Sequence, residues 1–80
     1  MTELRIPEAL WAGSLLPEGL LEVWRRHDGT VVQAGACLAD VRIEEALHEV
    51  VAPKGGRLRI FVRSNSVVEP GTVIGCIDPA

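Results

Sequence analysis

A seven-residue pattern occurs twice in the chain, as Gly29-Thr30-Val31-Val32-Gln33-Ala34-Gly35 and as Asn65-Ser66-Val67-Val68-Glu69-Pro70-Gly71. Each copy starts with a turn residue, continues with two β-branched valines and closes with a glycine. The first residues, Gly29 and Asn65, are of types that tolerate a positive φ. Because valine favours extended structure, the pattern predicts a turn followed by a short strand in each copy.

The repeat extends to both sides of this pattern. Residues 19–24 align with 56–61, and residues 38–41 align with 74–77. Two similar units that cannot bury their apolar faces alone must pack against each other. The sequence therefore predicts an all-β fold, a flattened β-barrel or sandwich of two quasi-symmetric four-strand halves, with residues 1–80 as a single domain.

Residues 42–50 link the two halves. This segment has helical propensity, but it is too short for a stable isolated helix. The symmetry of the repeat favours a β-hairpin there instead. The aromatic residues Trp24 and Phe61 occupy matching positions, and we predict that they are paired anchors of the core.

Composition excludes several classes of protein. The 80 residues are 48% hydrophobic and 24% charged, with a net charge of −3. No apolar stretch approaches the roughly 20 residues of a membrane span, and nucleic acid would require a basic face. Cys37 and Cys76 lie in apolar runs without a Cys-x-x-Cys pair, which predicts reduced thiols and no zinc site, with a disulfide as the open alternative. Together with an N-terminus unlike a signal peptide, this predicts a cytoplasmic protein.

The order and spacing of these elements resemble the biotinyl/lipoyl carrier domain, the barrel-sandwich that bears the swinging arm of 2-oxoacid dehydrogenases and biotin enzymes. The match runs from about Leu4 to Ile77. It rests on five segments: Ile6-Pro7, Gly19-x-Leu21-x-Val23-Trp24, Gly29-x-x-Val32-x-x-Gly35-x-x-Leu38, Val50-Val51-Ala52-Pro53-x-x-Gly56 and Val68-x-x-Gly71-x-x-Ile74.

The chain departs from this family at the residue that carries the cofactor. Family members place a lysine at the tip of the hairpin, whereas the aligned residues here are Glu44-Glu45-Ala46, with Glu45 at the lysine position. A carboxylate cannot form the amide that holds lipoate or biotin. The resemblance then implies a non-enzymatic binding module without cofactor or catalytic residues. It would dock on an acyltransferase, a carboxylase or a lipoate or biotin ligase.

Lys54 supports an alternative, because it is the only lysine in the chain. An acyl or carboxyl carrier subunit of a 2-oxoacid dehydrogenase or biotin-dependent complex would then bear lipoate or biotin on Lys54. The segment Pro53-Lys54-Gly55-Gly56 also fits an ordinary solvated turn. A third interpretation is a structural relic that has no partner.

The connection from Pro7 to Gly19 is longer than its counterpart in the second half and contains Leu10, Trp11, Leu15 and Leu16. In the family this loop lies beside the hairpin tip and takes part in partner recognition. The resemblance therefore implies a partner-binding surface made of these four residues with Glu44 and Glu45. The alternative is that the apolar residues fold over an open end of the barrel, since a small domain needs the extra burial.

The acidic residues near the tip do not predict a metal site. Glu44, Glu45, His48 and Glu49 lie close together in the sequence, with Asp40 on the incoming strand. Neighbouring residues of a hairpin alternate between faces, so these side chains cannot all converge on one ion. We expect an acidic, solvated turn.

Overall fold

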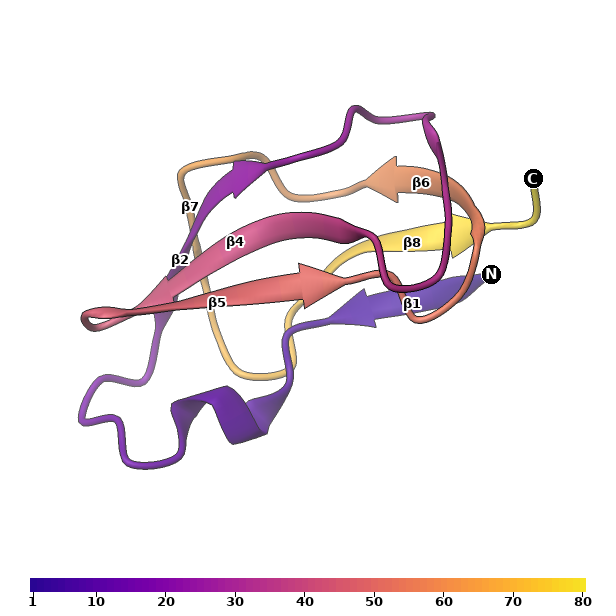
Figure 1. The fold of residues 1–80 in the computed structure, drawn as a ribbon. Coiled ribbons are helices and arrows are strands. Elements are labelled where there is room, and N and C mark those ends of the chain that lie inside the picture. The colour runs from indigo at the N-terminus through magenta and orange to yellow at the C-terminus, as the bar shows by residue number, and fades with distance from the viewer.

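The computed structural model describes all residues, 1–80, as eight strands and one short 3₁₀ helix (Figure 1). In chain order these are β1 (Thr2–Arg5), η1 (Glu8–Trp11), β2 (Gly19–Trp24), β3 (Val31–Val32), β4 (Cys37–Ile43), β5 (Ala46–Val51), β6 (Gly56–Ile60), β7 (Ser66–Val68) and β8 (Val73–Asp78). They form two four-strand sheets with the orders β1-β8-β6-β3 and β5-β4-β2-β7. All neighbouring strands are antiparallel. The predicted all-β fold of two sheets is confirmed.

The two halves repeat each other in backbone detail at the first turn of the seven-residue pattern. Gly29 and Asn65 both have positive φ, 87° and 67°. The N–H of Gly29 donates to the carbonyl of Leu58 at 2.7 Å, and the N–H of Asn65 donates to that of Leu21 at 2.6 Å. Each turn thus attaches to a strand of the opposite half. The predicted role of both residues as turn formers is confirmed.

The closing glycines of the pattern are equivalent in the same way. The N–H of Gly35 donates to the carbonyl of Ala52, and the N–H of Gly71 donates to that of Ile6, both at 2.8 Å. The two glycines have φ values of 86° and 84°, which side chains with a Cβ rarely adopt. These exchanged hydrogen bonds join the two halves into one domain.

The core is built from repeat-related pairs of apolar side chains. Leu21 and Leu58 occupy equivalent positions on β2 and β6, and both are completely buried. Three further equivalent pairs are also buried: Val32 with Val68, Leu38 with Ile74, and Ile6 with Ala52. The repeat is visible in the sequence because both halves contribute the same inward positions to one core.

The symmetry fails at the aromatic pair, and the prediction that Phe61 anchors the core is wrong. Trp24 packs against the core and its Nε1–H donates to the Val62 carbonyl at 2.7 Å, but Phe61 is 54% exposed. The backbone N–H groups of Phe61 and Val62 both donate to the Ile74 carbonyl. Because two successive residues share one acceptor, the inward position shifts by one residue, and Val62 packs on the core instead.

The predicted hairpin over residues 42–50 is present and joins the two halves. β4 and β5 pair from Ile43↔Ala46 outward, so Glu44 and Glu45 form a two-residue turn. Glu44 has a φ of 53°, in the left-handed region. The hairpin projects from one end of the molecule (Figure 1). The one helix, η1, is four residues long, and no helix is long and apolar enough to cross a membrane.

Candidate functional site

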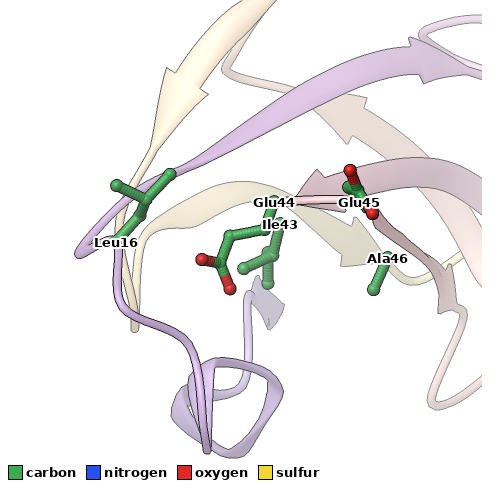
Figure 2. A pocket seen from close by; sticks show the side chains of 5 residues that line it. All are labelled: Leu16, Ile43, Glu44, Glu45 and Ala46. Carbon is green, nitrogen blue, oxygen red and sulfur yellow. The ribbon is translucent and has the colours of Figure 1, made fainter.

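The tip of the β4–β5 hairpin borders a hollow of the surface. Five residues line a pocket of about 580 Å³: Leu16, Ile43, Glu44, Glu45 and Ala46. Figure 2 shows the Glu44 carboxylate beside Ile43, on the side that faces Leu16. The pocket thus combines the hairpin tip with the loop that precedes β2. The structure brings Leu16, Glu44 and Glu45 together, as the resemblance implied for a shared surface.

A second hollow continues the first along the outer side of β2. It has a volume of about 260 Å³ and shares Leu16 and Glu44 with the tip pocket. Its other lining residues include Glu18 and Val67. Glu18 was not predicted as a site residue, although it lies in the same loop as Leu16. Ile43 was not predicted either, and Ala46 was noted only as the residue that follows the turn; their pairing across the hairpin was the available signal.

The loop between β1 and β2 divides into an anchored part and an exposed part. Trp11 is only 8% exposed and belongs to the core, and Leu10 is partly buried against that core. The prediction that Trp11 forms part of a partner surface is therefore corrected, because it lies in the core. Leu10 lines a hollow of about 190 Å³ beside Glu44 and Ala46, so its predicted place near the tip stands. Leu15 and Leu16 are 91% and 52% exposed. This second half of the loop is the most exposed apolar part of it.

Gly19 makes room for the indole of Trp11. A Cβ at Gly19 would lie 3.3 Å from Cζ2 of Trp11 and 3.0 Å from the Arg42 carbonyl oxygen. The indole Nε1 is buried and has no hydrogen-bond partner. Trp11 is thus held by apolar packing alone, and it anchors the loop that carries Leu15 and Leu16.

The acidic groups of the tip have no cationic partner within the chain. Glu18, Glu44 and Glu45 form no ion pair. The nearest cation in sequence, Arg42, binds the Glu22 carboxylate at 2.5 Å through Nε. That hydrogen bond raises the pKa of the Arg42 guanidinium. Arg42 also contacts the tip: its Nη1 donates to the Glu45 backbone carbonyl at 3.4 Å, and it lines the hollow that contains Glu18 and Glu44. Its ion pair is nevertheless with Glu22, so the carboxylates of Glu18, Glu44 and Glu45 have no ion-pair partner of their own.

Lys54 lies at the other end of β5. This strand starts at the tip and has six residues, about 20 Å at the usual rise per residue. Lys54 follows it in the turn before β6 and is exposed. The structure therefore does not bring Lys54 to the hairpin tip. No group of three or more His, Cys, Asp or Glu side chains is arranged to hold a metal ion.

The two cysteines are free thiols. A hydrogen bond with the Glu49 carboxylate, together with burial, raises the pKa of the Cys37 thiol. Burial, followed by the Asp78 carboxylate, raises the pKa of the Cys76 thiol. Because the thiolate is the nucleophilic form, a raised pKa leaves both groups poorly reactive at neutral pH.

Comparison with known proteins identifies the fold. No family model matches the chain, and no curated protein matches it. Among solved structures, the chain is similar to the solution structure of the lipoyl domain of the 2-oxoglutarate dehydrogenase complex from Azotobacter vinelandii. The TM-score is 0.70 at 20% sequence identity, and the match covers 79% of this chain and 81% of that chain. The protein has the lipoyl-domain fold.

Proposed function

We propose that this protein is a non-enzymatic, lipoyl/biotinyl-like binding module that docks on an acyltransferase, carboxylase or ligase partner and carries no cofactor. One observation carries the proposal. The two-residue turn of the hairpin, where the family resemblance expects the acceptor lysine, holds Glu44 and Glu45. The lipoyl-domain fold supports a role within an enzyme complex.

The chemistry of the tip supports docking over cofactor carriage. Attachment of lipoate or biotin requires an amine that attacks an activated carboxyl group, and Glu45 offers a carboxylate. The tip nevertheless retains an open pocket between the hairpin and the Leu16 loop. A surface of this kind can bind a partner although the residue that would carry the arm is absent.

The first test is the intact mass of the protein purified from its own cells. We expect an unmodified mass, because no amine is present at the tip. We also expect capture from native extract to retain an acyltransferase, carboxylase or ligase component. A mass raised by a lipoyl or biotinyl group would overturn the proposal, and so would retention of none of these components.

A second test determines whether a lipoate or biotin ligase can modify a lysine placed at the tip of the hairpin. Glu45→Lys, coexpressed with a lipoate or biotin ligase, should gain the mass of the cofactor. Glu44→Lys is the matched control, because it adds the same amine one residue earlier in the same turn. Modification of Glu44→Lys but not of Glu45→Lys would show that Glu45 is not the equivalent of the acceptor.

The alternative function is an acyl or carboxyl carrier modified at Lys54. The observation that favours it is the exposure of the only lysine of the chain in a turn. Lys54→Arg keeps the charge and removes the acceptor amine. If the intact mass of the variant differs from that of the wild type only by the substitution itself, and if the complex keeps its activity, this carrier function is excluded. Loss of a cofactor mass in the variant would establish it.

A further inference from the structure

The tip pocket has the chemical character of a receptor for a long cationic side chain. Its apolar wall consists of Leu16, Ile43 and Ala46. Its polar groups are the carboxylates of Glu44 and Glu45, and the adjoining hollow adds Glu18. An apolar wall beside carboxylates matches a side chain with an aliphatic stem and a positive head.

The charge of the pocket strengthens this match. None of the three carboxylates forms an ion pair, and Arg42, the one cation that lines the adjoining hollow, has its ion pair with Glu22. The chain's only lysine lies beyond the far end of β5. Carboxylates gathered at a hollow with apolar walls attract cations and repel anions.

We propose that this pocket binds an arginine that a partner protein presents between apolar residues. The guanidinium contacts the carboxylates of Glu44 and Glu45, and the methylene stem lies on Leu16 and Ile43. Arginine fits better than lysine because its planar guanidinium pairs with carboxylates through two hydrogen bonds and is less strongly hydrated.

This inference rests on the proposed function, since it supposes that the chain docks on a partner. It goes further in stating what the partner must present. A partner surface that is acidic at this point would be repelled, because like charges brought together across an interface are costly. The open pocket also keeps the charges hydrated, so the contact provides specificity and a rapid encounter more than high affinity.

The test uses the intact, ¹⁵N-labelled protein and two synthetic peptides. The probe is acetyl-Ala-Leu-Arg-Leu-Ala-amide, and its control replaces arginine with the neutral isostere citrulline. We expect the arginine peptide to shift the backbone amide resonances of residues 15–19 and 43–47. We also expect at least fivefold weaker binding of the citrulline peptide. Equal binding of the two peptides, shifts confined to other residues or no shifts at all would overturn the proposal.

Charge variants distinguish binding in the pocket from attraction of the peptide by the overall negative charge of the protein. The double variant Glu44→Gln with Glu45→Gln should weaken binding of the arginine peptide at least fivefold. The double variant Glu8→Gln with Glu69→Gln, at two exposed residues outside the pocket, controls for the loss of two negative charges and should change binding less than twofold. An equal effect of the control would show that the pocket is not the site. The amide spectra of all variants establish that they are folded.

Failure of this inference is distinguishable from failure of the proposed function. If native extract yields an enzyme-complex partner that the double variant still retains, docking stands and the arginine pocket is wrong. If the purified protein carries a cofactor, the proposed function fails. The peptide titration then still decides whether the pocket binds arginine.

Discussion

Substitution of Trp11 tests how the loop beside the tip is held in place. Trp11 lies in the core, but its indole N–H is buried without a partner. Trp24 differs in one respect that makes it a matched control, because its indole N–H donates to the Val62 carbonyl at 2.7 Å. We compare Trp11→Phe, Trp24→Phe and Trp11→Ala.

Two opposing free energies decide the outcome at Trp11. Phenylalanine removes about two buried carbons, which costs about 1.5 kcal/mol at ~0.8 kcal/mol for each buried methylene. It also removes an unpaired buried N–H, a group whose burial costs about 1–3 kcal/mol. The two contributions nearly cancel, so Trp11→Phe should change the free energy of unfolding by less than about 1 kcal/mol. Trp11→Ala should lower it by about 2 kcal/mol, because Trp→Ala costs of about 3–5 kcal/mol are reduced by the same relief.

At Trp24 the contributions have the same sign. Trp24→Phe loses part of the packing and also the hydrogen bond, which leaves the Val62 carbonyl without its donor. We expect a loss of about 2 kcal/mol in the free energy of unfolding. Urea unfolding followed by far-UV circular dichroism measures all three variants, and the remaining tryptophan serves as a second probe. A cost above 3 kcal/mol for Trp11→Phe, with less than 0.5 kcal/mol for Trp24→Phe, would refute the reasoning.

Three further predictions concern stability. Burial raises the pKa of the Cys76 thiol in the folded state. The contribution of the protonated thiol to the free energy of unfolding is therefore complete below the unfolded-state pKa near 8.5 and is lost as pH rises through the folded-state pKa. The urea midpoint should fall less between pH 7 and pH 10 in Cys76→Ala than in the wild type. Glu44→Asn should raise the free energy of unfolding by about 0.5–1 kcal/mol, because asparagine adopts a φ of 53° more readily, and a lower urea midpoint would contradict this. Leu58→Ala should lower the free energy of unfolding by about 2–5 kcal/mol, whereas Phe61→Ala should lower it by less than about 1 kcal/mol. Urea unfolding measures both, and equal losses would mean that Phe61 is not on the surface.

The site at the hairpin tip was partly predictable. Residues 42–50 have helical propensity, but the symmetry of the repeat predicted a hairpin, and the structure has a hairpin whose turn is Glu44-Glu45. The split of the loop could not be foreseen, because residues 8–18 have no periodicity that separates inward from outward positions. Trp11 and Leu15 are both large apolar residues, and only the space beside Gly19 shows which of them the core accepts.

The sequence by itself determined the repeat, the all-β class and most of the core. Equivalent positions such as Leu21 and Leu58 must be apolar in both halves because they meet in one interior. The tertiary structure decided the exceptions. The offset of the repeat changes by one residue after Trp24 and Phe61 in the sequence, but only packing shows that Phe61 points outward and Val62 inward. Packing of Trp11 likewise left Leu16 beside Glu44 and Glu45. Both outcomes depend on the space left by distant segments, and local sequence patterns contain no measure of that space.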